Sequence, residues 1–369
     1  MREKKGRHLT AALAAAVLAA LLLSGCGRAN GEKNRAAAVK MADFILSLQQ
    51  KDGAIPDTAD AESVNEDSNM EYALMALAAA YRSTGEEKYR SGLERGIAWL
   101  ADAEVVEDGK WNGSWWYRYG RNGIPLHGPG DVRGVDTTSA LFVYLLYLDQ
   151  EYTGSGALAE RYQANAAAAL EFVLTENRTE EGFFASSFRR DEGDNWSRYE
   201  VCYSADQGDV WLGLQAGALL YGKDEYRQAA DFLRKNVPPV FFSERERRYC
   251  TGIEDGRPDW SEQGFDSIQS QGFLPWMWGK TRENKASVRW LRARAAENHP
   301  QEYFLTAAFL GLGETGIGGA LFEKECARLI ENGLDNATGG VYDTPRDHTE
   351  SVNTAAFCVL ALLASPTGF

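Results

Sequence analysis

The chain has 369 residues and a formal net charge of −14, with 39 Lys and Arg against 53 Asp and Glu. This balance excludes proteins that bind nucleic acid through its phosphates, because Lys and Arg supply that affinity. With only four histidines and no C-x-x-C pair among its five cysteines, the sequence predicts neither a metal site nor a cofactor.

Residues 1–25 have the pattern of an export signal. A basic start is followed by an apolar run from Leu9 to Leu23, and "LSGC" at 23–26 resembles the lipobox of bacterial lipoproteins. We therefore expect export from the cytoplasm and anchoring to the bacterial membrane by a lipid such as palmitate on Cys26. A plain secretory signal or a spanning helix is the alternative, although the run is short for a span. Removal of residues 1–25, with four Lys or Arg and one Glu, changes the net charge from −14 to −17.

After a polar spacer at 26–34, residues 35–369 are expected to form one domain of two alternating kinds of helix. One kind is amphipathic, such as "EYRQAADFLRKN" (225–236), and the other is apolar all round, such as "TTSALFVYLLYL" (137–148). A helix that is apolar on every side must be buried on every side. The predicted helices in chain order are 35–50, 68–82, 87–103, 137–150, 157–175, 206–221, 224–236, 264–280, 283–297, 301–313, 319–333 and 351–364.

These twelve helices pair into six hairpins, each with one amphipathic and one apolar member. The pattern predicts an inner ring of six helices enclosed by an outer ring of six. Within 264–280, Pro275 is expected to kink or shorten the helix. Links from inner to outer helices are short, whereas the outer-to-inner links are long and hold most of the unusual residues. Because all long links emerge at one face, we expect that face to carry the function.

This plan resembles the (α/α)6 toroid shared by the six-hairpin glycosidases, several polysaccharide lyases and sugar epimerases, and the terpenoid cyclase and prenyltransferase group. The resemblance covers about residues 35–364 and identifies no single family. It rests on the hairpin count, on the loop "QQKDGAIPDT" and on its echoes "EDGKW", "EEGFF", "EDGRPDW" and "TGGVYDT". It implies an all-α fold, the (α/α)6 toroid, and leaves the function to be argued from the site.

Acids and amides occur at or just before the start of each inner helix. They are Asp67, Asn69, Glu71, Asp131, Asp136, Asp206, Asp209, Asp266, Glu302, Glu350 and Asn353. Helix capping explains such residues one at a time. Six helices that converge on one rim would nevertheless gather carboxylates, and hydrolysis of a glycosidic bond needs two of them, an acid and a base or nucleophile. We predict Asp136 and Asp209 as this pair, then Asp206 and Glu71. In toroid glycosidases and unsaturated glucuronyl hydrolases the catalytic carboxylates likewise lie at inner-helix starts, so the resemblance implies the same location.

Aromatic residues concentrate in the long links, above all in "WNGSWWYRYG" at 111–120. A pyranose stacks its apolar face on such rings, so we expect a carbohydrate platform, with a plug over the ring as the alternative. Arg118, Arg121 and Arg133 are candidates for binding a uronate carboxylate. The predicted substrate-binding residues are Trp111, Trp115, Trp116, Tyr117, Tyr119, Trp196, Trp211, Trp260, Tyr342 and Arg133.

The sequence therefore predicts a membrane-anchored carbohydrate-active enzyme, in the first place a glycoside hydrolase acting on an oligosaccharide or polysaccharide. A polysaccharide lyase is one alternative, with Tyr119 or His127 as its base. A noncatalytic glycan-binding lipoprotein is another. Terpenoid or prenyl chemistry is disfavoured, because neither D-x-D-D nor D-D-x-x-D occurs in the chain.

Overall fold

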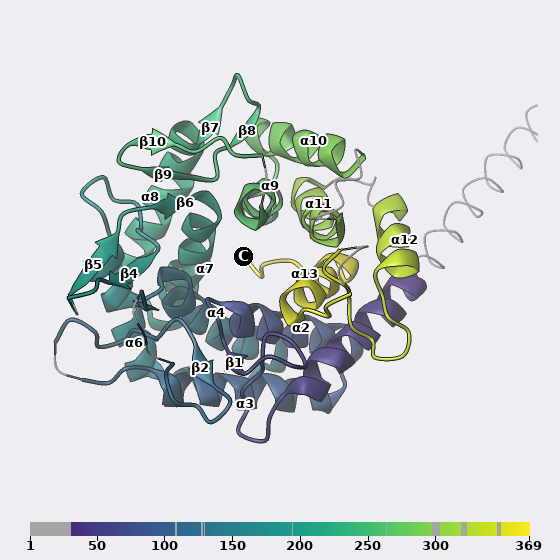
Figure 1. Cartoon of the computed structure of the whole chain (residues 1–369), viewed down its shortest axis with the longest axis horizontal. Coiled ribbons are helices and arrows are strands. Elements are labelled where there is room, and N and C mark those ends of the chain that lie inside the picture. The colour runs from purple at the N-terminus through teal and green to yellow at the C-terminus, as the bar shows by residue number, and fades with distance from the viewer. Residues whose placement is uncertain are drawn as a thin grey trace, which may run out of the picture.

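The protein is an (α/α)6 toroid, as predicted. The computed structural model describes residues 31–107, 109–126, 128, 130–193, 195–262, 264–296, 303–318, 323–344 and 348–369. Within them, a ring of six inner helices is enclosed by outer helices (Figure 1). The predicted signal peptide at 1–25 and Cys26 lie outside the described residues. No helix in the described part is both long and apolar enough to cross a membrane.

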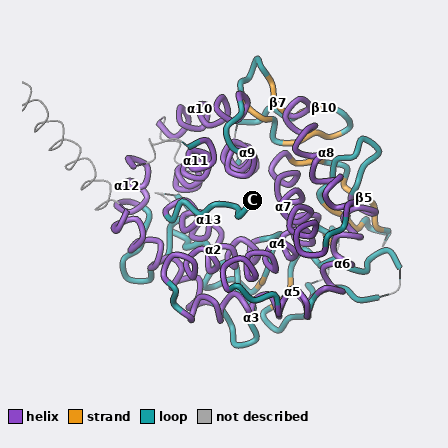
Figure 2. Tube along the Cα trace, turned by 180° about the vertical axis from the view of Figure 1, so that it is seen from behind, coloured by secondary structure: helices purple, strands orange, loops and turns teal. Residues whose placement is uncertain are grey.

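The inner ring consists of the helices that the sequence makes apolar all round. Each packs against the next, and α13 closes the ring on α2 (Figures 1 and 2). In ring order they are α2 (Asn69–Thr84), α4 (Asp136–Thr153), α7 (Ser204–Tyr221), α9 (Phe265–Trp278), α11 (Tyr303–Ile317) and α13 (Val352–Leu362).

The outer ring is formed by the amphipathic segments. It contains the helix 31–48, α3 (Glu87–Ala103), α5 (Ala157–Arg161), α6 (Gln163–Phe172), the π-helix η1 (Val173–Asn177), α8 (Asp224–Phe241), α10 (Arg282–Ala296) and α12 (Glu323–Asn332). All twelve predicted helices therefore form, and 157–175 does so in three consecutive segments. The first outer helix already includes residues 31–34, which the sequence analysis assigned to the spacer.

Glycines make the links from inner to outer helices short. Gly85, Gly154 and Gly222 follow α2, α4 and α7 with φ of 72°, 70° and 69°. This left-handed conformation ends a helix and costs glycine little, because it has no Cβ. The long links then all lie at the opposite end of the ring, where the inner helices begin.

Pro275, which was expected to kink or shorten its helix, lies near the end of α9. It lies in the last turn, and the helix ends at Trp278. A proline has no N–H to donate to the carbonyl four residues earlier, which here belongs to Gln271. That carbonyl instead accepts a hydrogen bond from Ser287 Oγ of α10, at 3.2 Å.

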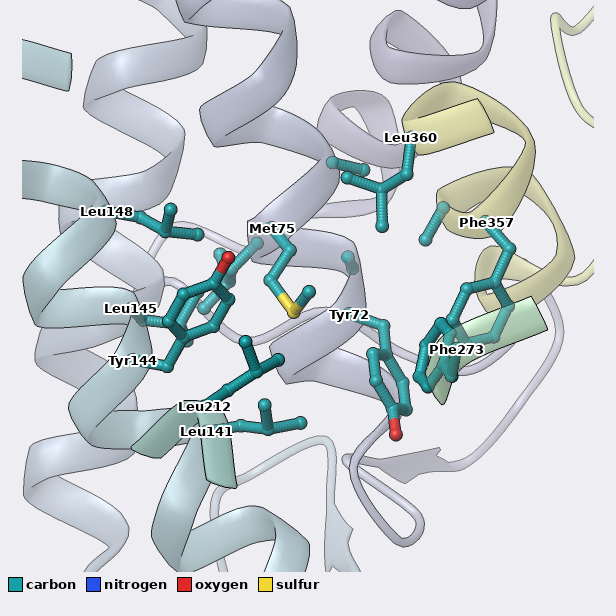
Figure 3. Packing of buried hydrophobic residues seen from close by; sticks show 14 of the residues in the cluster. Tyr72, Met75, Leu141, Tyr144, Leu145, Leu148, Leu212, Phe273, Phe357 and Leu360 are labelled. Carbon is teal, nitrogen blue, oxygen red and sulfur yellow. The ribbon is translucent and has the colours of Figure 1, made fainter. Parts of the chain in front are cut away.

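Apolar side chains fill the middle of the ring. Figure 3 shows Met75 of α2 between Leu141 and Leu212 on one side and the ring of Phe273 on the other. Tyr72, one turn earlier in α2, lies with its ring centroid 4.8 Å from that of Phe357. The toroid is therefore a packed core and not an open tube.

The C-terminal residues close the end of the ring away from the long links. Trp276 Nε1 donates to the carbonyl of Ser365 at 2.7 Å, and Tyr144 Oη donates to the carbonyl of Thr367 at 2.9 Å. The ring of Phe369 stacks on that of Tyr147, with centroids 4.8 Å apart. The C-terminus accordingly lies at the centre of the ring in Figures 1 and 2.

Short strands, which the sequence analysis did not predict, connect the long links to one another. We number these links from the first (49–68) through the second (104–135), third (178–203) and fourth (242–264) to the sixth (333–351). The antiparallel sheets have the orders β1-β2, β3-β4-β5, β6-β9-β10 and β7-β8. The strands are β1 (Ser63–Val64), β2 (Tyr119–Gly120), β3 (Val132–Arg133), β4 (Ser187–Arg190), β5 (Trp196–Tyr199), β6 (Cys202–Tyr203), β7 (Phe242–Ser243), β8 (Arg248–Tyr249), β9 (Gly252–Glu254) and β10 (Arg257–Pro258).

The cysteines in the described part of the chain form no disulfide. Cys202, Cys250, Cys326 and Cys358 are all free and buried.

Two buried glutamines attach the long links to the inner helices. Gln207 accepts a hydrogen bond from the N–H of Phe184 and donates to its carbonyl, both at 2.9 Å. Gln271 makes the same pair of bonds with Tyr249, at 3.0 and 3.1 Å. Each side-chain amide thus satisfies one backbone N–H and one backbone C=O that would otherwise be buried without partners.

We expect Gln207→Ala to lower the free energy of unfolding by about 2–4 kcal/mol, because it leaves these two buried backbone groups without partners. Urea unfolding followed by circular dichroism measures the change. Gln228→Ala, on the exposed side of α8, is the control and should change stability by less than about 0.5 kcal/mol. Equal effects of the two substitutions would contradict this role of Gln207.

Candidate active site

Five aspartates from the starts of four inner helices form an acidic cluster at the face of the long links. They are Asp67, Asp136, Asp206, Asp209 and Asp266, and they act on one another's pKa values. Desolvation by the surrounding protein, followed by the charges of Asp266 and of two other carboxylates, raises the pKa of Asp67 to about 7. Neighbouring carboxylates that hold different pKa values can supply an acid and a base at the same pH.

The members of the acidic cluster differ in exposure, and this changes the choice of catalytic residues. Asp136 and Asp209, like the neighbouring Glu71, are 0 % exposed. Asp206 is partly exposed and Asp67 is exposed. Of the four predicted catalytic carboxylates, Asp206 alone therefore has surface to offer a substrate, and the prediction for the other three is not supported by their placement.

The enclosed carboxyls are held in a buried polar network. Asp209 accepts a hydrogen bond from Tyr72 Oη at 2.9 Å, and this hydroxyl in turn accepts one from Gln269 Nε2 at 3.3 Å. Asp136 and Glu71 each accept one hydrogen bond, and in the described structure the other oxygen of all three carboxyls has no partner. Burial raises the pKa of each of them well above its ordinary value, which favours the protonated form.

The backbone at Asp67 is held in a conformation that few residues other than glycine adopt, with φ of 60°. Its N–H donates to the carbonyl of Tyr117 at 2.9 Å, and its carbonyl accepts from Thr138 Oγ1 at 3.1 Å. The second link and α4 therefore fix the position of its carboxylate. The sequence placed Asp67 among the helix-start acids but gave no reason to select it, because the sign of φ is not visible in the pattern.

Asp266 is a half-buried member of the cluster, in the first turn of α9. Burial raises its pKa, and no neighbouring charge is among the causes. Its own charge raises the pKa values of Asp67 and Asp206. Glycosidic hydrolysis requires one ionised and one protonated carboxyl, and Asp266 and Asp67 are the candidates for these two roles.

Three tryptophans of the second and third links surround Arg133. Its guanidinium carbon lies 4.0 Å from the ring centroid of Trp111, 4.4 Å from that of Trp116 and 5.6 Å from that of Trp196. Arg133 is 6 % exposed, and burial lowers its pKa to about 10. These cation–π contacts connect the two links. The stretch 111–120 thus forms a structural cluster around an arginine, and the three half-buried indoles keep some surface for a ligand.

Three predicted sugar-binding aromatics are buried and pack within the fold. Trp115 Nε1 donates to the carbonyl of Leu100 at 2.8 Å, and Tyr119 Oη donates to that of Ala103 at 3.0 Å. Trp211 is 3 % exposed and contacts the C-terminal residues. In this structure they have almost no surface for contact with a substrate, and Tyr119 has almost none for action as the base of a lyase. His127, the other candidate base, lies outside the described residues.

The remaining predicted aromatics occupy three separate places. Tyr117 is half-buried beside the acidic cluster, where burial and the charge of Asp67 raise its pKa. Trp260 lies at the fourth link with the guanidinium carbon of Arg248 5.7 Å from its ring centroid. Tyr342 lines a pocket between the first and sixth links.

No Lys or Arg is among the charged groups that most strongly shift the pKa values of Asp67, Asp136 and Asp206. The charges that raise the pKa values of Asp67, Asp136 and Asp206 are all carboxylates. Arg121 is engaged elsewhere, donating to two backbone carbonyls of the first link. Within the described residues, no group of three or more His, Cys, Asp or Glu is arranged to hold a metal ion.

Comparisons with known proteins identify the fold. The chain matches no protein-family model and no curated protein sequence. Among solved structures it is similar to a wild-type glycosidase, with a TM-score of 0.60 and 11% identity over 90% of this chain and 96% of that one. It is also similar to the GH76A alpha-1,6-mannanase of Salegentibacter sp. HEL1_6, with a TM-score of 0.59 and 11% identity over 90% and 98% of the two chains. An inactive variant of that mannanase, with two aspartates changed to asparagine, is solved in complex with alpha-1,6-mannotriose (TM-score 0.59, 12% identity, 90% and 98% covered).

The raised pKa values of the enclosed carboxyls predict how stability depends on pH. Because the folded state holds the proton of Asp136 more tightly than the unfolded state does, stability should fall as pH rises above about 4, by up to about 1 kcal/mol per pH unit. Asp136→Asn cannot ionise, so its melting temperature should fall less between pH 5 and pH 8 than that of the wild type. The exposed Asp102→Asn is the control. The expectation fails if the two variants show the same pH dependence.

Proposed function

We propose that the protein is a glycoside hydrolase that acts on a neutral oligosaccharide. The observation that carries this proposal is the acidic cluster, in which exposed and partly exposed carboxyls with raised pKa values meet at one face of the ring. The fold supports it, because similar solved structures are named glycosidases. One of these relatives is named an alpha-1,6-mannanase, so alpha-1,6-linked mannose oligomers are the first substrates to test.

In this proposal Asp67 is the general acid and Asp266 the base or nucleophile. The charge of Asp266 helps to keep the proton on Asp67, which then protonates the oxygen of the leaving sugar. Asp266 either activates a water molecule or attacks the anomeric carbon. Asp206, partly exposed and subject to both of these charges, is the third carboxyl that can contact the reacting sugar.

Hydrolysis is favoured over elimination by the charges of the site. A lyase must stabilise the carboxylate of a uronate, and the strongest electrostatic influences on the acidic cluster are themselves negative. A negatively charged substrate would be repelled at such a site. For the same reason we propose that the substrate is a neutral sugar. It then differs from the uronate that Arg118, Arg121 and Arg133 were considered to bind in the sequence analysis above.

The exported location remains part of the proposal. The basic start, the apolar run and the sequence "LSGC" at 23–26 support attachment to the membrane through a lipid on Cys26. Residues 31–48 form the first outer helix, so only a short segment separates Cys26 from the toroid. The enzyme would then act close to the cell surface.

We expect Asp67→Asn and Asp266→Asn to lower kcat for hydrolysis of a neutral oligosaccharide such as alpha-1,6-mannotetraose by roughly 100- to 10,000-fold. Activity of the wild type should fall as pH rises through about 7, because Asp67 must be protonated to act as the acid and its pKa is raised to about 7. Release of reducing sugar measures both effects. The control Asp102→Asn should keep wild-type kcat, and full activity of the two cluster variants would refute the assignment.

A further inference from the structure

A pocket of about 600 Å³ lies between the first and the sixth long links. It is at the same face of the ring as the acidic cluster, because both links lead into inner helices. Its lining includes Thr58 and Asp60 from the first link and Asp335, Tyr342, His348 and Glu350 from the sixth. The mechanism proposed above uses none of these residues.

The walls of the pocket are fixed by hydrogen bonds within and between the two links. Thr58 pairs with Ser351 in a β-bridge, and Tyr342 pairs with Glu350 in another. Tyr342 Oη donates to Asp335 Oδ2 at 2.7 Å. A ligand therefore meets side chains that are already ordered, which lowers the entropic cost of binding.

Gly340 leaves the space that the carboxylate of Glu350 occupies in the sixth link. A Cβ at this position would lie 2.6 Å from Glu350 Cδ, closer than real contacts allow. Only glycine lets the carboxylate of Glu350 lie against the backbone here. The same carboxylate accepts a hydrogen bond from the hydroxyl of Thr338.

Two stacked rings form one side of the pocket. The centroids of Tyr342 and His348 lie 4.4 Å apart, and the rings are inclined by only 4°. His348 is exposed and Tyr342 is half-buried. A flat ring surface beside polar side chains suits a pyranose, which has an apolar C–H face and a polar edge.

The carboxylates of the pocket disfavour an anionic ligand. Three carboxylates line it, from Asp60, Asp335 and Glu350, and no Lys or Arg is among the lining residues in the described structure. Carboxylates accept hydrogen bonds from sugar hydroxyls and repel an anionic sugar.

We propose that this pocket is a second sugar-binding site, which holds a neutral hexose unit of the oligosaccharide outside the catalytic cluster. The proposal takes its substrate class from the proposed function. The first link runs from the pocket to the start of α2, near the acidic cluster. Asp57, which directly precedes Thr58, accepts a hydrogen bond at 2.9 Å from Nδ2 of Asn69, the first residue of α2. The charge of Asp57 also contributes to the raised pKa of Asp67. One oligosaccharide can therefore be positioned by the pocket and cleaved at the cluster.

The test measures binding at the pocket itself, in a form that does not turn over substrate. The C2–H proton resonance of His348 is assigned by comparison with His348→Gln, and Asp266→Asn serves as the background. Glucose, mannose, galactose, N-acetylglucosamine and glucuronate are titrated separately. At least one neutral sugar should shift the His348 resonance saturably, and glucuronate should not.

Two substitutions in the pocket and one control substitution test whether the sugar binds there. Tyr342→Ala and, independently, the exposed Asp60→Ala should each weaken binding of that sugar about tenfold or more. Tyr152→Ala, in a pocket at the far end of the ring, should leave the affinity unchanged. The proposal is overturned if no neutral sugar shifts the resonance, if only glucuronate does, or if neither pocket variant weakens binding. Since no hydrolysis is measured, these outcomes are independent of the catalytic test above.

Discussion

The crowding of like charges at one end of a closed ring is the constraint on which this structure depends. Inner helices that are apolar on all sides pack into a ring, and their starts meet at one face, so acids placed there must share a small region. Such carboxylates cannot all be ionised at neutral pH. The protein buries some of them, such as Asp209, which favours their protonated form, and leaves others, such as Asp67, accessible. In the proposed site, Asp67 and Asp266 then supply the acid and the base.

The rest of the fold keeps that site at one end and in one shape. The C-terminal residues close the far end of the ring, where Phe369 stacks on Tyr147. At the near end, short strands and buried amides such as that of Gln207 connect the long links to one another and to the inner helices. The tryptophans around Arg133 serve the same purpose, with cation–π contacts between the second and third links. Most of the unusual residues in the links therefore position the surface that faces a ligand.

The architecture was predictable from the sequence and the choice of site residues was not. Helices that are apolar all round, alternating with amphipathic ones, have few solutions other than two concentric rings, and the predicted ranges match the observed helices closely. Exposure within the acidic cluster depends on tertiary packing, so Asp136 and Asp209 could not be distinguished from Asp206 by pattern. Asp67 depends on a left-handed backbone conformation that no spacing reveals. The aromatic run 111–120 lies in the second long link, as predicted, but its contact with Arg133 and the burial of Trp115 required the structure.

In the proposed function, the accessible carboxylates hydrolyse a glycosidic bond. One measurement tests this hydrolysis directly. The protein is incubated with neutral and uronate-containing oligosaccharides in water enriched in oxygen-18. The masses of the products are measured by mass spectrometry. We expect products from neutral oligosaccharides only, with one oxygen-18 atom incorporated for each bond cleaved. Unsaturated products without the label would show elimination, and unchanged neutral oligosaccharides would show that the acidic cluster does not perform hydrolysis.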